Sequence, residues 1–176
     1  MIRKTSRSEF VSSLTTLKED KFAKTFVAKC DMMDHWENCM GYWVDGELAG
    51  AIVVTLSKRQ PIVANLQLLH TFYKHRGNGV ARKLTEWGVQ DAYDNKALYF
   101  RVSAELDAVD FYKKVGFVFV GKQKTAELSM FRLTSPNIKG NDFEPDSFIW
   151  KSMTRKGKGG CIEYYFQQRT VEDFYG

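Results

Sequence analysis

The stretch HRGNGVARKLTEWGVQDAY, from His75 to Tyr93, places a cation and two glycines directly in front of a run with helical periodicity. It follows the apolar run 62–73, whose residues are typical of a β-strand. From Val80 onward apolar residues recur every three or four positions, and Asp94-Asn95-Lys96 ends the pattern, which predicts a helix. A strand, a glycine-rich turn and a helix in this order form either an ordinary connection or a binding site for phosphate groups.

The turn at residues 76–81 has the chemistry of an anion site. A helix that begins here leaves its first backbone N–H groups without intrahelical partners, and the positive end of the helix dipole lies behind them. Gly77 and Gly79 let a phosphate approach the backbone, and Arg76 and Arg82 can add charge-assisted hydrogen bonds. The spacing matches neither the P-loop nor the GxGxxG motif, so the turn alone leaves both interpretations open.

Positive charge is concentrated in the same part of the chain. The net charge is +5, and residues 58–133 alone hold 13 Lys and Arg against 7 Asp and Glu. A basic region of this kind attracts a nucleic acid or a polyanionic small molecule. A solvated basic surface accounts for the charge as well, so composition does not choose between these alternatives.

Length and composition indicate a folded domain. The 176 residues suffice for one domain with or without an appended segment, and 44% apolar with 27% charged residues is ordinary globular usage. No run reaches the roughly 18 apolar residues of a membrane span, and the first ten residues lack the apolar segment of a secretory signal. Three cysteines without framework spacing indicate reduced thiols. We therefore expect a cytoplasmic protein that does not bind membranes.

Short patterns predict the other elements. Asp45-Gly46 between two β-rich runs predicts a type I′ hairpin, because both central residues of that turn need positive φ. Helical spacing begins near Ser8, with Ser6 or Ser8 as the cap, and residues 30–39 look like a connection. The remaining expected elements are strands at 2–4, 97–103, 117–122 and 127–133, and a short helix at 106–117 that ends at Gly116.

The predicted order is a strand, a helix, a meander of three strands, then helix, strand, helix and two strands. This order predicts an α/β fold whose mixed central sheet combines an antiparallel meander with a parallel crossover from 62–73 to 97–103. Residues 1–133 would form this domain, and residues 134–176 a C-terminal extension packed on it. Within the extension, strands at 147–153 and 161–168 are expected to form an appended hairpin.

Two motifs together resemble landmarks of the GNAT N-acetyltransferase superfamily. The run 76–81 matches its (Gln/Arg)-x-x-Gly-x-(Gly/Ala) signature through Arg76, Gly79 and Ala81. Later in the chain, AVDFYKKVGF at 108–117 resembles the A-x-x-x-Y-x-x-x-G-F landmark of the same family. Both motifs stand in the right order between the right elements, and the resemblance covers residues 1–133, which implies a GNAT-like fold.

The resemblance implies an acyltransferase that uses acetyl-CoA as cosubstrate and acetylates an amine by direct attack in a ternary complex. The backbone of the turn would hold the pyrophosphate of coenzyme A, and a strand end would pair with its pantetheine arm. The implied pyrophosphate contacts are Arg76, Gly77, Asn78, Gly79, Val80, Ala81 and Arg82, and the implied pantetheine positions are Thr71, Phe72 and Tyr73. Coenzyme A would then be the polyanion that the basic region attracts.

Acetyl transfer also needs a proton for the departing thiolate and a base for the amine. By the resemblance Tyr112 supplies the proton, and the alternative is that it packs beside Phe111. The family often carries its base on the strand before the turn, but that strand has no carboxylate here, which leaves Gln67, His70 or a water chain. His70 is either this base or a hydrogen-bonded core histidine. Glu105 stands where many relatives have Asn.

Further patterns carry less weight. Cys30, His35 and Cys39, with distant Cys161, have a spacing that matches no common zinc framework, so no metal is expected. The pairs His35-Trp36 and Tyr42-Trp43 either border the acceptor pocket, as in the family, or are ordinary core and surface aromatics.

The acceptor and the partners stay open at this point. The acceptor is expected to be a small amine or a protein amino group, with a nucleobase or nucleic acid as a third alternative. The basic loop 154–160, with Trp150, Tyr164 and Tyr165 nearby, would suit a nucleic acid or be a solvated loop. A GNAT-like binding module without catalysis is the rival function, and a homodimer is compatible with the sequence.

Overall fold

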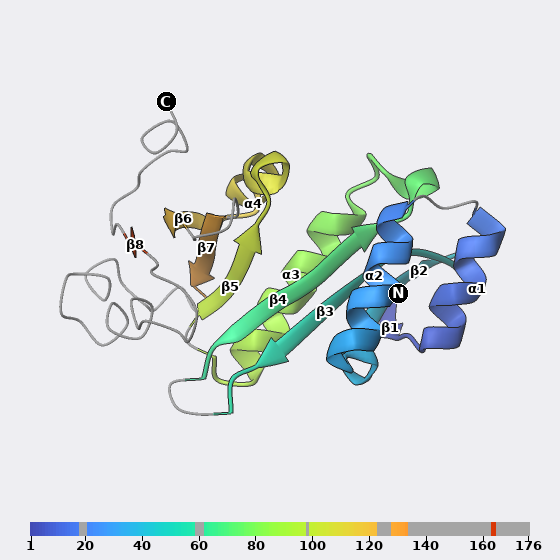
Figure 1. Cartoon of the computed structure of the whole chain (residues 1–176), viewed down its shortest axis with the longest axis horizontal. Coiled ribbons are helices and arrows are strands. Elements are labelled where there is room, and N and C mark those ends of the chain that lie inside the picture. The colour runs from blue at the N-terminus through green and yellow to red at the C-terminus, as the bar shows by residue number, and fades with distance from the viewer. Residues whose placement is uncertain (18–20, 59–61, 98, 123–127, 134–162, 165–176) are drawn as a thin grey trace. The chain divides into compact units, whose positions relative to one another are not determined.

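The computed structural model describes residues 1–17, 21–58, 62–97, 99–122, 128–133 and 163–164 (Figure 1). The chain forms two compact units, one of residues 1–55 and 66–88, the other of residues 56–65 and 89–176. In the part of the chain that the structure describes, no helix has the length and apolar character of a membrane span.

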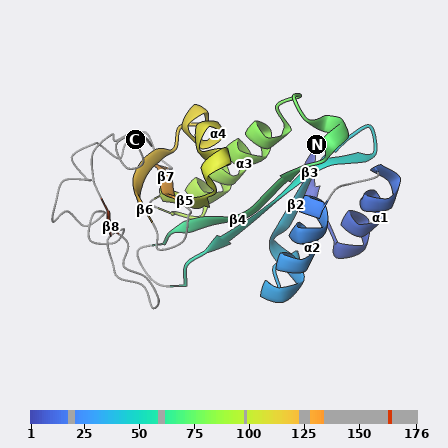
Figure 2. The ribbon, with the colours of Figure 1, turned by 45° about the horizontal axis from the view of Figure 1, so that its top comes forward.

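The first unit places helices on both faces of its strands. Its strands follow the order β1-β2-β3-β4, with β1 antiparallel to β2 and β2 antiparallel to β3. Figure 2 shows α1 and α2 on one face of these strands and the first turns of α3 on the other. The elements that begin in this unit are β1 (Ile2–Lys4), α1 (Arg7–Leu17), α2 (Lys21–Met33), η1 (Trp36–Asn38), β2 (Cys39–Val44), β3 (Glu47–Leu56), η2 (Tyr73–His75) and α3 (Val80–Asp94). Strand β4 (Ala64–Thr71) belongs to this unit from Leu66 onward.

Two local predictions are confirmed at the start of the chain. The Ser6 N–H donates to the Glu9 carboxylate (2.8 Å) and the Glu9 N–H to the Ser6 hydroxyl (3.3 Å), which is a capping box at the start of α1. Asp45 and Gly46 have φ of 49° and 78°, and Val44 pairs with Glu47, as the type I′ hairpin requires.

The predicted connection at 30–39 is wrong over its first part. Helix α2 continues to Met33, and Asp34 leaves it with a φ of 52°. Its buried positions Ala23, Phe26 and Cys30 lie three and four residues apart, so they face one side of the helix. Apolar residues at other positions of the helix, such as Val27 and the exposed Phe22 and Met32, hide this spacing in the sequence.

Aromatic rings build the core of the first unit. Phe10 of α1 and Phe26 of α2 stack with ring centroids 4.6 Å apart, and Phe72 lies 5.2 Å from Phe10. The buried core residues are Phe10, Ala23, Phe26, Cys30, Cys39, Leu48, Ala51, Val53, Leu68 and Phe72.

Gly50 lets α3 approach the strands closely. A Cβ at this position would lie 2.6 Å from the backbone oxygen of His70 and 2.7 Å from Cγ1 of Val80. Since the His70 backbone cannot move away, Gly50→Ala is expected to displace the first turn of α3 and to lower the free energy of unfolding by about 1–3 kcal/mol. Urea denaturation measures this loss, with Gly46→Asn in the open hairpin turn as the control. An unchanged midpoint for Gly50→Ala would contradict the close packing.

The second unit is a set of antiparallel strands with a short helix. Its strands follow the order β5-β7-β6-β8, and each neighbouring pair is antiparallel. Gly116 has a φ of 91° and its N–H donates to the Lys113 carbonyl (3.1 Å), so it ends the helix as predicted. The elements are β5 (Tyr99–Ala104), η3 (Leu106–Ala108), α4 (Val109–Lys114), β6 (Val118–Lys122), β7 (Leu128–Leu133) and β8 (Glu163–Tyr164).

The predicted α/β order is confirmed through β7, apart from the additional helix α2. The strand expected at 62–73 is shorter, because the chain turns into η2 after Phe72. Of the strand expected at 161–168, the structure describes β8, which pairs with β6. The strand expected at 147–153 lies outside the described residues, and the division at residue 133 stays a prediction.

Candidate active site

The turn between β4 and α3 presents backbone amides at a helix start. Arg76 is extended, whereas Gly77 and Gly79 have φ of 80° and 73° in the left-handed region. The Lys83 N–H donates to the Gly79 carbonyl (3.0 Å) and closes the first turn of α3. The amides at the start of this turn therefore have no acceptor within the helix. An anion placed there would meet N–H groups and the positive end of a long helix.

The space on the Cβ side of both glycines in this turn is open. A Cβ built on Gly77 or on Gly79 would meet no heavy atom within 4 Å. A phosphate group can therefore approach the backbone at both positions without displacing a side chain. The turn fits the phosphate groups that the resemblance assigns to it.

At the strand end before the turn, the backbone groups of Phe72 are already hydrogen-bonded within the protein. The Phe72 N–H donates to the Ala49 carbonyl (3.0 Å), its carbonyl accepts from the His75 N–H (2.9 Å), and its ring is buried. Strand residues alternate in direction, so the amide of Thr71, the last residue of β4, points away from β3, whereas Tyr73 already begins η2. Both backbone groups of Phe72 are thus occupied, and the pairing of a pantetheine arm with Thr71, Phe72 and Tyr73 stays a prediction.

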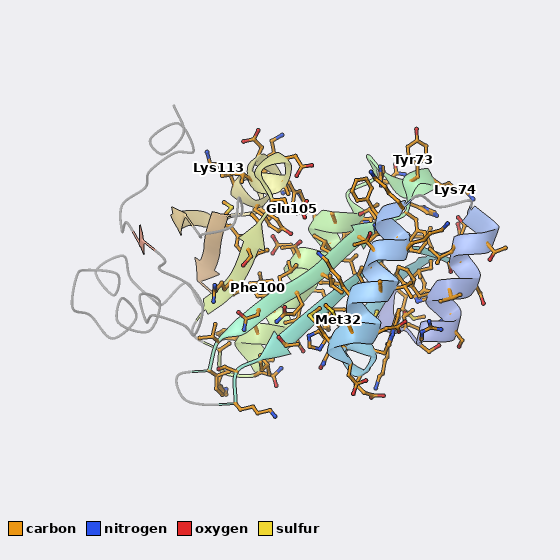
Figure 3. The ribbon with its side chains drawn as sticks, viewed as in Figure 1. Met32, Tyr73, Lys74, Phe100, Glu105 and Lys113 are labelled. Atoms are coloured by element: carbon orange, nitrogen blue, oxygen red, sulfur yellow. The ribbon has the colours of Figure 1, made fainter. Side chains whose placement is uncertain are left out.

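Arg76 is held above this strand end. Its Nε donates to the Thr71 carbonyl (3.3 Å), and its guanidinium lies 5.3 Å from the centroid of the Tyr73 ring. Tyr73 is 70% exposed, and Figure 3 shows it pointing away from the strands. The cation thus stands at the rim of the turn.

The structure places His70 among aromatic rings. Its ring lies 5.1 Å from Phe72 and 6.4 Å from both Phe10 and Phe26, and the residue is 7% exposed. This geometry favours the core alternative for His70. Gln67 is exposed on the same strand, and its amide donates to the Thr55 hydroxyl (2.9 Å).

Glu47 is a charged residue beside the turn that the sequence did not single out. From the first position of β3 it contacts Lys74 and His75 of η2, at 2.9 Å and 2.6 Å. The hydrogen bond from Lys74 and then that from His75 lower the pKa of the Glu47 carboxyl. The hairpin at Asp45-Gly46 was the available signal, since it fixes where β3 begins.

Tyr112 belongs to the second unit and is almost fully buried. Its ring packs against Phe111 (5.1 Å) and Phe117 (5.4 Å). Burial raises the pKa of the Tyr112 phenol above its ordinary range, and the nearby Glu105 charge raises it further. The side chain therefore stays a neutral phenol at neutral pH and keeps a proton to donate.

The two described cysteines are core residues. Cys30 and Cys39 are free and buried, and burial raises the pKa of their thiols to about 11 and about 12. Among the described residues, no group of three side chains is placed to hold a metal ion. Cys161 lies outside them.

The aromatic pairs have local partners. The Trp36 indole donates to Asp31 (2.7 Å) and the Trp43 indole to Thr5 (3.0 Å), while Tyr42 accepts from Lys83 (3.1 Å). Trp43 also lines a hollow of about 500 Å³ beside α1 and the hairpin tip. Their role at an acceptor pocket stays a prediction. Trp150, Tyr165 and the loop 154–160 lie outside the described residues, and of Tyr164 only the backbone is described.

Comparison with known protein families shows the family to which the chain belongs. Residues 10–131 match the family described as Acetyltransferase (GNAT) domain. The chain belongs to the GNAT acetyltransferase family. The match spans the turn 76–81 and Tyr112, so both motifs of this GNAT protein lie inside the family domain.

Relatives and folds agree with this membership. The GNAT chain is 28% identical over 111 residues to streptothricin acetyltransferase from Escherichia coli, and the match covers 61% of the chain and 62% of that relative. The structure of aminoglycoside 6′-acetyltransferase type Ii is similar, with a TM-score of 0.62, 16% identity and coverage of 78% and 99%. PaiA N-acetyltransferase from Thermoplasma acidophilum, solved in complex with coenzyme A, has a TM-score of 0.59, 13% identity and coverage of 76% and 98%. These two structures show the fold.

Proposed function

We propose that this GNAT protein transfers an acetyl group from acetyl-CoA to an amine, by direct attack while both substrates are bound. The observation that carries the proposal is the turn 76–81 before α3. It combines amides without intrahelical acceptors, two glycines of positive φ and open space, inside a GNAT acetyltransferase domain. Two of the three cysteines of the chain, Cys30 and Cys39, are free and buried, which favours a cytoplasmic protein.

In this proposal different residues bind different parts of acetyl-CoA. The amides of residues 77–81 would hold the pyrophosphate, with Arg76 and Arg82 adding charge-assisted hydrogen bonds. Thr71 and Tyr73 would pair with pantetheine through their backbone. When bound, acetyl-CoA supplies a thioester carbonyl for the amine to attack and a thiolate as leaving group. Tyr112 would donate the proton that this thiolate takes up.

His70 is the residue whose proposed role as base is most directly testable. Because its ring packs among three phenylalanines, His70→Gln is expected to lower the free energy of unfolding by about 1–2 kcal/mol. Loss of a general base costs roughly 100-fold or more in rate, whereas loss of a core residue leaves kcat within about fivefold. We expect the second result. Urea unfolding and a thiol-release assay on the same preparation measure both quantities, and a large fall in kcat at unchanged stability would make His70 the base.

A small amine is the acceptor class that we favour. The streptothricin acetyltransferase of Escherichia coli, whose sequence this chain partly matches, takes its name from a small molecule. Thiol release from acetyl-CoA should therefore be faster with streptothricin or simple polyamines than with lysine-containing peptides or oligonucleotides. Activity on peptides alone would move the proposal to a protein amino group.

A binding module without catalysis is the second candidate. The absence of a carboxylate on β4 and the presence of Glu105 favour it. Calorimetric titration with acetyl-CoA distinguishes the two, because the proposed enzyme binds the cosubstrate and the module does not. No heat and no thermal shift would overturn the proposed function.

A further inference from the structure

A carboxylate on the neighbouring strand contacts the two side chains that precede Arg76, Lys74 and His75. Glu47 accepts hydrogen bonds from Lys74 Nζ (3.0 Å) and from His75 Nε2 (2.6 Å). Both donors belong to η2, which ends one residue before Arg76. Glu47 is therefore an acidic anchor of η2.

The sheet itself brings these residues together. The Phe72 N–H donates to the Ala49 carbonyl, so the end of β4 lies beside β3 two residues from Glu47, and η2 follows directly. The hairpin at 45–46 fixes where β3 starts. The side chains of His75 and Glu47 are 14% and 28% exposed, so this contact is more enclosed than a surface ion pair.

The charge of Glu47 is unfavourable for an anion site by itself. A carboxylate beside the turn repels a polyanion such as coenzyme A. Its contribution must therefore come from geometry. An ionised carboxylate holds two donors at once, and the backbone between those donors and Gly77 is short.

We propose that Glu47 is a positioning residue for the phosphate turn: it fixes Lys74 and His75, and through them the placement of Arg76 and the amides that follow. The inference rests on the proposed function, because it assigns the turn to coenzyme A. Glu47 touches no substrate in this scheme and acts only through η2.

Glu47→Gln separates geometry from charge by the sign of its effect. The substitution keeps the shape of the side chain, removes the charge and leaves one weak acceptor for two donors. Positioning predicts roughly fivefold to tenfold weaker binding of coenzyme A, with a matching rise in KM for acetyl-CoA and kcat within about twofold. If Glu47 acts only through the repulsion between its charge and coenzyme A, the Glu47→Gln variant should bind coenzyme A more tightly than wild type. Calorimetry with coenzyme A measures the affinity.

Asp45→Asn is the matched control. It removes the same charge from the same hairpin, two residues from Glu47, and Asn tolerates the φ of 49° at this position. Its affinity for coenzyme A should be unchanged or slightly higher. Weakening equal to that of Glu47→Gln would overturn the inference, because the effect would then follow the charge of the hairpin.

A second pair of measurements does not depend on turnover. Without ligand, Glu47→Gln should speed amide hydrogen exchange in the segment 75–79. His75→Ala should weaken coenzyme A binding in the same direction, and the double variant should bind no worse than Glu47→Gln alone. Effects that multiply, or unchanged exchange and affinity in Glu47→Gln, overturn the inference while the proposed function stands. A wild-type protein that does not bind coenzyme A overturns both.

Discussion

Tyr112→Phe is expected to lower kcat for acetyl transfer by roughly 100-fold while coenzyme A affinity stays within about twofold. The substitution removes only the hydroxyl, and the ring still packs against Phe111 and Phe117. Stability should therefore change little. Steady-state kinetics with a thiol-release assay give kcat, and calorimetry with coenzyme A gives the affinity.

The protonation state of Tyr112 adds a second signature. Burial, reinforced by the Glu105 charge, raises the pKa of the phenol, and a donor of this kind is competent below its pKa. The rate should therefore show no fall from Tyr112 ionisation as the pH rises to 9. Tyr93→Phe, at an exposed tyrosine of the same unit, is the control. Full activity in Tyr112→Phe would mean that water or another group protonates the thiolate.

The elements that were predictable are those whose signal is local. The Asp45-Gly46 hairpin, the capping box at Ser6 and the end of α4 at Gly116 each depend on a few adjacent residues with a special backbone conformation. The turn 76–81 is of the same kind, since its glycines and the helix that follows are contiguous in sequence. Local chemistry therefore predicted most of the fold and the strand-turn-helix connection at 76–81.

Helix α2 shows why other elements were missed. Its apolar face is narrow, with Ala23, Phe26 and Cys30 as the buried positions, and Phe22 and Met32 are exposed. The helix is stabilised by tertiary packing, above all by the stack of Phe26 on Phe10. A pattern of this kind is visible only when the partner surface is known.

The candidate site residues also fall into those that a local motif contains and those whose contacts depend on tertiary packing. Glu47 reaches η2 by side-chain contacts from the neighbouring strand, and its partners lie far away in sequence, so no motif contains it. His70 has a pKa range that suits a base, but its surroundings are aromatic, and the sequence could not reveal them. Residue type predicted what these side chains are able to do, and the packing decides what they contact.

Gly79→Trp is expected to weaken coenzyme A binding by roughly 100-fold or more. The space that a Cβ at Gly79 would enter is open, and it is the space that the proposal gives to the pyrophosphate. An indole there would fill it and block the amides at the start of α3. Several charge-assisted hydrogen bonds would be lost together, and calorimetry measures the loss directly.

Backbone strain must be separated from this steric effect, because Gly79 has a φ of 73°. Gly79→Asn is the matched control, since Asn tolerates the left-handed region at a small cost and adds little volume. It should keep coenzyme A affinity within about tenfold of wild type, whereas both variants should melt at similar temperatures. If Gly79→Trp binds coenzyme A as tightly as Gly79→Asn, the pyrophosphate does not lie at this turn.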